Sequence, residues 1–124
     1  MKNDMNRVAV VIPNWNGQDM IGKCVDSLLN QQSVKPIIIV VENGSVDDSL
    51  TILKTYGDSI IVLVQKENLG FAGGVNAGIK HALDLGVEHI ALFNNDAVAD
   101  PDWLISLVRT LDSSKEAGIA TSKI

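Results

Sequence analysis

The sequence lacks the features that mark disulfide-rich, membrane-spanning and DNA-binding proteins. It has a single cysteine, Cys24, so no disulfide can form within the chain, which fits a reducing compartment. No apolar run approaches the ~20 residues that cross a bilayer, and residues 1–7 are too polar for a signal peptide. The net charge of −5 argues against a basic face that wraps DNA. We therefore predict a cytoplasmic protein with no nucleic-acid partner and no membrane span; peripheral attachment to a membrane stays open.

Familiar catalytic and phosphate-binding signatures are also missing. No Ser/His/Asp or Cys/His nucleophile set is visible, and His81 and His89 lack a spacing typical of metal ligands. The glycine-rich stretch 68–78 matches neither the dinucleotide fingerprint Gly-x-Gly-x-x-Gly nor the P-loop Gly-Lys-Ser/Thr. In an acidic chain, the charge of a phosphorylated ligand would have to be offset by a divalent cation, backbone N–H groups or a helix N-terminus.

The chain of 124 residues is long enough for one domain with a single core. Short apolar runs predict strands at 8–12, 37–41, 60–64 and 90–93, and the start of a further strand at 117–120. Helical spacing and start signals predict helices at 20–31, from a capping box at 45–48, at 73–85, and from Asp100-Pro101 onward. This order predicts a three-layer α/β/α domain around a mostly parallel sheet, with Cys24 as a small buried helix residue.

Polar clusters lie just past the predicted strands or in the turn before a helix. They are Pro13-Asn14-Trp15-Asn16, the stretch 42–47, the glycine-rich stretch 68–78, and Phe93-Asn94-Asn95-Asp96. In open α/β sheets, ligands bind outside the carboxyl ends of the strands. Clusters that share one edge therefore predict a binding site rather than scattered loops.

The residues alone leave structural alternatives open beside the functional ones. Asp96 can ligate Mg²⁺ or Mn²⁺ together with substrate phosphates and water, or it can shape a turn. Glu42 can accept a hydrogen bond from a base or a ribose hydroxyl, and turn chemistry gives it no role. Trp15 is either a stacking surface for a base or a cover for the core. Gly78 costs on the order of 1 kcal/mol against Ala within a helix, which predicts close packing against a strand.

With these residues in view, the sequence from about Val8 to Ile124 resembles the amino-terminal, nucleotide-sugar-binding half of a family 2 glycosyltransferase with the GT-A fold. The family has a Pro/Thr-x-aromatic-Asn turn after the first strand, which residues 13–16 match. It has Asp-Asn-x-Ser-x-Asp after the second strand, which residues 42–47 match with Glu42 in the first place.

Two further family motifs are matched later in the chain. Paired Asn-x-Gly motifs correspond to 68–70 and 76–78, although Val75 stands where many relatives have Arg. The Asp-x-Asp metal motif reads Asn94-Asn95-Asp96, so the aspartate has no carboxylate neighbour within the motif. This Asn-Asn-Asp resembles rhamnosyltransferase-like members and favours a dTDP-linked deoxysugar.

The resemblance implies a donor site for a dTDP- or UDP-linked sugar, with Mn²⁺ or Mg²⁺ held by Asp96. Pro13 and Trp15 would frame the base, and Glu42 would contact it. Asn94 would face the ribose or the sugar. The implied donor-binding residues are Pro13, Trp15, Asn16, Glu42, Asn43, Ser45, Asn68, Gly70, Asn76, Asn94 and Asn95.

The implied reaction is inverting transfer of the sugar to an acceptor hydroxyl in cell-surface polysaccharide synthesis. In the family the catalytic base and the acceptor site lie in a second half, so we expect them beyond Ile124 and interpret 1–124 as one donor-binding domain. A non-catalytic nucleotide-binding or interaction module with the same fold is the alternative. A flavodoxin-like receiver would need an acidic cluster after the first strand, where residues 13–16 stand instead.

A donor-binding half on its own predicts self-association into a homo-oligomer. Missing strands would leave an open sheet edge and an uncovered apolar face, which strand pairing or exchange between copies can cover. We expect static light scattering at low micromolar concentration to give a mass above that of one chain. A single monomeric species under these conditions would contradict the prediction.

Overall fold

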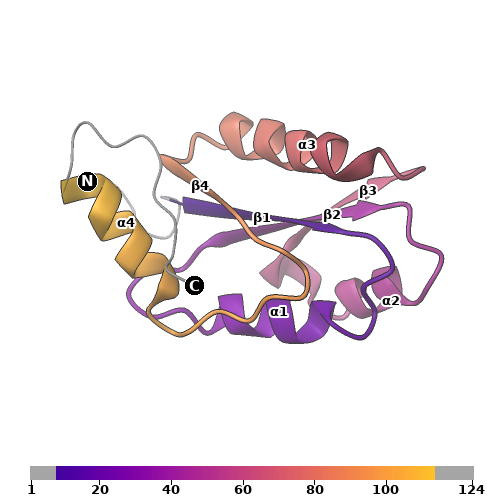
Figure 1. Cartoon of the computed structure of the whole chain (residues 1–124), viewed down its shortest axis with the longest axis horizontal. Helices are drawn as coiled ribbons and strands as arrows, with labels where there is room; N and C mark the ends of the chain where they lie inside the picture. Colours follow the sequence, from indigo (N-terminus) through magenta and orange to yellow (C-terminus); the bar gives the residue numbers. More distant parts are fainter. Residues whose placement is uncertain (1–7, 114–124) are drawn as a thin grey trace.

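The computed structural model describes residues 8–113 as an α/β fold built on one sheet (Figure 1). All strands are parallel, in the order β3-β2-β1-β4. Their bounds are β1 (Val8–Asn14), β2 (Ile37–Asn43), β3 (Ile61–Gln65) and β4 (His89–Leu92). The predicted α/β class with a parallel sheet is confirmed, and the strand predicted at 117–120 lies outside the described residues.

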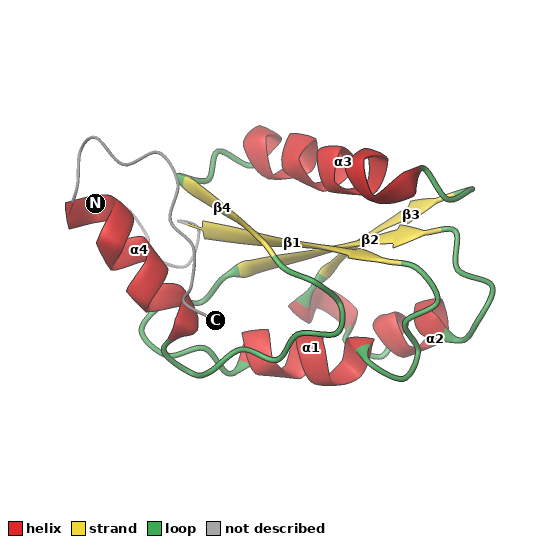
Figure 2. Ribbon diagram, in the orientation of Figure 1, coloured by secondary structure: helices red, strands yellow, loops and turns green. Residues whose placement is uncertain are grey.

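Helices cover both faces of this sheet, as the predicted three-layer architecture requires (Figure 2). One face is covered by α3 (Gly70–Asp84). The other face packs against α1 (Ile21–Leu29), α2 (Ser49–Lys54) and α4 (Trp103–Ser113), and the short 3-10 turn η2 (Gly57–Ser59) precedes β3. Within residues 8–113, every helix is too short or too polar to cross a membrane.

Alternate residues of the central strands face opposite helical layers, as strand geometry dictates. In β1, Val8, Val10 and Ile12 belong to the core shared with α1 and α4, whereas Ala9 and Val11 face α3. The residues of β2 divide in the same way. Because both faces are covered, these strands are apolar at nearly every position, which explains the continuous apolar runs in the sequence.

The two central strands extend beyond the apolar runs that predicted them. β1 continues through Asn14, and β2 continues through Glu42 and Asn43. Asn14 stands opposite Glu42 in the register of the two strands. All three side chains are buried. The polar residues at this end of the sheet therefore have the fixed backbone of a strand rather than that of a loop.

The capping box predicted at 45–48 is wrong, because α2 begins at Ser49. The Ser45 hydroxyl donates a hydrogen bond to the Glu42 carboxylate and does not cap the helix. The Ser49 amide is instead bound by Asp47 Oδ1 at 2.9 Å.

Two other helices begin at positions different from those predicted. α3 begins at Gly70, about one turn before residue 73, and α4 begins at Trp103, just after the Asp100-Pro101 signal. The Leu104 amide in α4 donates to Gln31 Oε1 at 2.9 Å, and Gln31 Nε2 donates to the Asp100 carbonyl at 2.7 Å. A buried amide just after α1 thus holds the start of α4.

Gly78 allows α3 to approach the sheet closely, as predicted. The residue is buried, and a Cβ atom there would overlap Val11 Cγ1 and lie 3.1 Å from Val41 Cγ2. Only glycine leaves room for these two strand side chains.

Gly78→Ala should lower the free energy of unfolding by about 1–2 kcal/mol, because core overpacking typically costs ~1–3 kcal/mol and the gain in helix propensity offsets up to ~1 kcal/mol. Gly22→Ala is the matched control: Gly22 lies in α1, and a Cβ there would meet the Tyr56 hydroxyl at an ordinary 3.7 Å. The control should raise the free energy of unfolding by up to ~1 kcal/mol. Urea denaturation measures both changes, and equal stabilisation by the two variants would contradict the close packing at Gly78.

Candidate functional site

The predicted polar clusters meet at one end of the sheet, because β1, β2 and β4 are parallel and end at the same edge. A cavity of about 380 Å³ opens there, within the size range of ligand pockets. Its lining comes from the segments after these strands and the start of α3: Pro13, Asn14, Trp15, Asn43, Asn68, Gly70, Phe71, Asn94, Asn95 and Asp96.

A larger hollow of about 520 Å³ lies at the opposite end of the sheet, beside the start of β2 and the η2 turn. Its lining is mostly apolar, with side chains such as Leu28, Ile38 and Ile60, and includes none of the predicted site residues. The 380 Å³ cavity is the candidate site, because polar groups from several separate segments converge on it.

Some predicted site residues do not line the cavity. These are Asn16, Glu42, Ser45 and Asn76. Asn76 is exposed on α3, and its contact with a ligand stays a prediction. The other three belong to a hydrogen-bonded network behind the lining, and this network determines the shape of the loops.

The Glu42 carboxylate is buried at the end of β2, with 2% of the residue exposed. Asn14 Nδ2 donates to its Oε1 atom at 3.1 Å, and the Ser45 amide donates to Oε2 at 3.0 Å. The Ser45 hydroxyl also donates to Oε1. A buried carboxylate needs such donors to compensate for lost hydration. Glu42 therefore positions the surrounding loops, and its direct contact with a base stays a prediction.

The loop after β1 is held against the loop after β2 through Asn16. The backbone N–H of Asn16 donates to Ser45 Oγ at 2.8 Å, and Asn16 Oδ1 accepts from the backbone N–H of Val46 at 2.9 Å. Asn16 has a positive φ of 51°, a conformation that asparagine tolerates better than most residues. The loop carrying Trp15 is thus fixed by backbone geometry as well as by hydrogen bonds.

A second pair of bonds continues the contact between these loops. Asp47 Oδ2 accepts from the backbone N–H of Gln18 at 3.1 Å. The backbone N–H of Asp48 donates to the side-chain oxygen Gln18 Oε1 at 2.9 Å. Burial raises the pKa of Asp47, but hydrogen bonds from Ser49 and Gln18 outweigh that effect and leave the pKa below its ordinary value. Asp47 is therefore a charged acceptor that holds the start of α2 beside the first loop.

The glycine-rich turn is held by Asn43, the last residue of β2. Its Nδ2 atom donates to Asn68 Oδ1 at 3.1 Å and to the Gly70 carbonyl at 3.0 Å, while its Oδ1 atom accepts from the Leu69 amide at 2.9 Å. Gly44 has a φ of 80°, and a Cβ there would lie 2.7 Å from the Asn68 backbone nitrogen. These contacts place the N-terminus of α3 at the cavity, where a helix favours anionic groups.

The Asn94–Asp96 loop follows β4 and contributes the only carboxylate in the described lining of the cavity, that of Asp96. The Ala97 amide donates to the Asn94 carbonyl at 3.1 Å, which closes the turn. Asn95 Nδ2 donates to Asn14 Oδ1 at 3.0 Å, which ties this loop to the end of β1. Asp96 itself is exposed toward solvent.

Cys24 lies beneath this loop in α1, and the prediction of a buried helix residue is confirmed. Its Sγ atom lies 3.5 Å from the Asn94 carbonyl oxygen. Burial, with a smaller contribution from the Asp96 carboxylate, raises the pKa of Cys24 from 9.0 to about 12. The side chain is therefore a protonated thiol that donates a weak hydrogen bond to the loop.

The donor set of the loop suits a metal that is shared with a ligand. Residues 8–113 hold no group of three or more His, Cys, Asp and Glu side chains that could enclose an ion. Asp96 offers a carboxylate beside the amides of Asn94 and Asn95, all at the border of an open cavity. Mg²⁺ and Mn²⁺ fit such a site, since they accept oxygen ligands and take several from phosphates and water.

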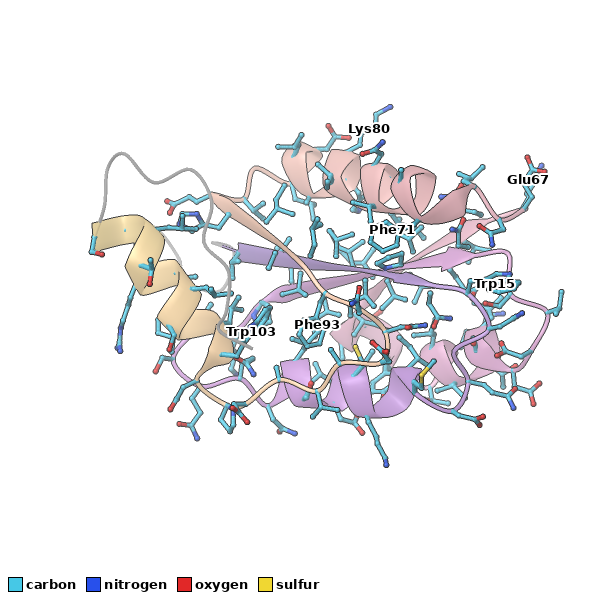
Figure 3. The ribbon with its side chains drawn as sticks, in the orientation of Figure 1. Trp15, Glu67, Phe71, Lys80, Phe93 and Trp103 are labelled. Carbon is cyan, nitrogen blue, oxygen red and sulfur yellow. The ribbon has the colours of Figure 1, made fainter. Side chains whose placement is uncertain are left out.

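Sequence reasoning missed two residues of the cavity. Asn14 was part of a recognised motif but received no role; its position opposite Glu42 in the strand register is the signal that could have found it. Phe71 was hidden in the glycine-rich stretch, and it lines the cavity with 64% of its surface exposed. Trp15 is 54% exposed, which disfavours a role as core cover, and Figure 3 shows it at the end of the sheet remote from Trp103.

The fold and the site define an α/β domain with a polar ligand cavity at the carboxyl ends of parallel strands. The chain belongs to glycosyl transferase family 2, whose sequence profile matches residues 9–123. It is 34% identical over 109 residues to an uncharacterized glycosyltransferase of Rickettsia prowazekii, covering 86% of this chain and 33% of that protein. It is 34% identical over 114 residues to the poly(ribitol-phosphate) beta-glucosyltransferase of Bacillus spizizenii, covering 89% and 17%. The chain thus spans a third or less of these two relatives.

Solved structures share the fold at lower sequence identity. S. aureus TarS 1-349 in complex with UDP matches with a TM-score of 0.73 and 19% identity, over 94% of this chain and 38% of that one. The mannosyltransferase PcManGT from Pyrobaculum calidifontis, in complex with GDP-Man and Mn²⁺, gives a TM-score of 0.74 and 21% identity, over 85% and 32%. These similarities confirm the predicted GT-A fold.

The Cys24 thiol should resist alkylation at pH 8, because its pKa of about 12 leaves almost no thiolate. Cys24 is the only cysteine in the sequence, so thiol labelling reports on this site alone. As a control, Cys24→Ala combined with Asp19→Cys moves the thiol to an exposed position nearby, where labelling should be fast. Asp96→Asn should lower the pKa of Cys24 modestly, since the carboxylate is the second contributor after burial.

The same shift predicts the pH dependence of stability. The pKa of the native thiol lies above that of the unfolded chain, so its contribution to stability is complete below pH 9.0 and is lost as pH rises toward 12. Urea unfolding of wild type and Cys24→Ala between pH 8 and 11 measures this contribution. A native thiol that titrates near 9 would contradict its burial beneath the loop.

Proposed function

We propose that this chain forms the donor-binding part of a glycosyltransferase that uses a nucleoside diphosphate sugar. The observation that carries the proposal is the convergence of an exposed aromatic ring, a helix N-terminus and a carboxylate on one cavity, contributed by Trp15, Gly70 and Asp96. A nucleoside diphosphate presents a planar base, two phosphates and their counter-ion. Structural neighbours solved with UDP, UDP-GlcNAc or GDP-Man support this class of ligand.

In this proposal the base stacks on Trp15 beside Pro13, because an exposed indole offers a large apolar face. The diphosphate lies near the start of α3, whose orientation is set by Asn43 and Asn68. Asn94 faces the ribose or the sugar. Asn16, Glu42 and Ser45 act behind the lining by holding the loop that carries the tryptophan. Asn76 is included from family resemblance alone.

Asp96 would hold Mn²⁺ or Mg²⁺, with the amide oxygens of Asn94 and Asn95 nearby. When bound, such an ion supplies positive charge that neutralises the departing diphosphate. The chain's own residues orient the donor and present a single carboxylate to the ion. The lack of a second carboxylate in the described lining makes the phosphates themselves necessary ligands.

The finer assignment follows the family resemblance. We propose inverting transfer to an acceptor hydroxyl, with the base and acceptor site supplied beyond Ile124, and a dTDP- or UDP-linked donor. Relatives named poly(ribitol-phosphate) beta-glucosyltransferase and chondroitin synthase support a role in polysaccharide synthesis. We further propose that the protein acts in the cytoplasm or at the membrane surface, and self-associates through a sheet edge, where Leu92 of β4 is 51% exposed.

Calorimetric titration with UDP, dTDP and GDP, each with and without Mn²⁺, tests the donor site. We expect Mn²⁺ to strengthen binding of the preferred nucleotide at least about tenfold, and Asp96→Ala to abolish that gain, since a tenfold change corresponds to ~1.4 kcal/mol. Asp19→Ala removes an exposed carboxylate outside the cavity lining and should bind like wild type. Absence of binding to every nucleotide would refute the donor site and favour the non-catalytic interaction module.

A further inference from the structure

We infer that Asn14 is a positioning residue that couples nucleotide binding to metal binding, an inference that rests on the proposed donor site. Its side chain bonds two residues that are distant in sequence, Glu42 near the end of β2 and Asn95 in the loop after β4. Asn14 Nδ2 donates to Glu42 Oε1 at 3.1 Å, and Asn14 Oδ1 accepts from Asn95 Nδ2 at 3.0 Å. The residue is fully buried and stands at the end of the central strand β1. One side-chain amide thus lies between Glu42, which holds the Trp15 loop through Ser45, and the loop that carries Asp96.

The chemistry of the two partners fixes the orientation of each amide. An ionised carboxylate only accepts hydrogen bonds, so Asn14 must direct its Nδ2 atom toward Glu42. Its Oδ1 atom then faces the other loop and only accepts, so Asn95 must turn its own Nδ2 atom inward. Asn95 Oδ1 accepts no hydrogen bond from residues 8–113, and Asn95 borders the cavity. The charge on Glu42 therefore determines which end of the Asn95 amide stays available to a ligand.

The packing around Asn14 allows little adjustment. A Cβ atom at Gly17 would overlap both Asn14 Oδ1 and Asn95 Nδ2, so the first loop closes directly over the bond between them. The backbone of Asn14 is fixed by its pairing with Glu42 in the parallel register. Within the described residues, no second chain of side-chain hydrogen bonds joins the two loops. A shift of one loop is therefore transmitted to the other through this amide.

Such a link predicts a reciprocal effect of nucleotide and metal on each other's affinity. Side chains that orient metal ligands from behind typically change metal affinity by about 10–100-fold when they are removed. The quantity to measure is the coupling ratio, defined as the affinity for UDP in saturating Mn²⁺ divided by the affinity without metal. A residue that only stabilises the fold changes the melting temperature and leaves the coupling ratio of the folded protein unaltered.

The experiment is calorimetric titration of UDP with and without Mn²⁺ on wild type and two Asn14 variants. Asn14→Leu removes the hydrogen-bond donor and the acceptor at nearly constant side-chain volume. Asn14→Asp keeps an acceptor for Asn95 but places a second carboxylate against that of Glu42. We expect both to reduce the coupling ratio by about tenfold or more, with a smaller loss of metal-free UDP affinity. Circular dichroism establishes that each variant is folded at the temperature of the titration.

Two further variants separate positioning from stability. The double variant Asn14→Asp with Glu42→Gln exchanges acid and amide between the strands, so a donor again faces a carboxylate, and it should recover much of the coupling ratio. Gln31→Met is the matched control, because Gln31 is a buried amide that bonds Asp100 and Leu104 away from the cavity. It should lower the melting temperature and keep the wild-type coupling ratio.

The outcomes distinguish this inference from the proposed function. If wild type binds no UDP under any condition, both the proposed donor site and the inferred coupling are refuted. If wild-type binding of UDP depends on Mn²⁺ and the folded Asn14 variants keep the full coupling ratio, the inference alone is overturned and the donor site stands. The inference alone is also overturned by a second pair of results. In that case the folded double variant Asn14→Asp with Glu42→Gln recovers none of the coupling ratio, and Gln31→Met lowers the ratio as much as Asn14→Leu does. If Asn14→Leu does not fold, Asn14→Asp and the exchanged pair decide the question.

Discussion

A negative charge buried at the end of β2 organises the carboxyl edge of the sheet. The Glu42 carboxylate is shielded from water, so its energy depends on donors from the protein, and Asn14 and Ser45 supply them. Ser45 in turn accepts from the Asn16 backbone, which holds the loop carrying Trp15. Removing the charge would take away the acceptor shared by Asn14 and Ser45, and the loops after β1 and β2 would keep only the bonds of Asn16 and Gln18 to residues 45–48. The position of the loop that carries Trp15 thus depends in part on satisfying one buried carboxylate.

Close approach at glycine is the complementary constraint on the position of α3. Gly78 brings α3 against β1 and β2, and Gly44 lets the loop after β2 lie against the backbone of the glycine-rich turn. Asn43 then bonds that turn and sets where α3 begins. The helix is therefore positioned at two points, one in the apolar layer and one at the cavity. Together these contacts hold the N-terminus of α3 at the cavity, where its free N–H groups favour an anion.

The sequence predicted the fold well because the central strands are covered on both faces and read as continuous apolar runs. The predicted strands ended too early where polar residues continue a strand, as Asn14 and Glu42 do. These two residues are polar because they pair with each other across buried strands, not because they are exposed to solvent. The capping box failed because the hydroxyl of Ser45 bonds the Glu42 carboxylate, three residues earlier at the end of β2, instead of the backbone of α2. The residues facing the cavity were largely predicted from motif position. Which of them touch the ligand and which lie behind it depends on side-chain direction, which short motifs do not encode.

The described lining of the cavity contains Asp96 and no lysine or arginine, in a chain with a net charge of −5. A free nucleoside diphosphate would meet a repulsive field on its way to this site, and only a helix terminus would oppose that field at short range. Added salt would then speed its arrival, the reverse of the behaviour of basic nucleotide sites, because screening weakens repulsion. A donor that arrives already paired with its divalent ion avoids this barrier. In the proposed function, the electrostatics of the described lining thus favours an order in which the ion first meets the nucleotide and the pair then meets the protein.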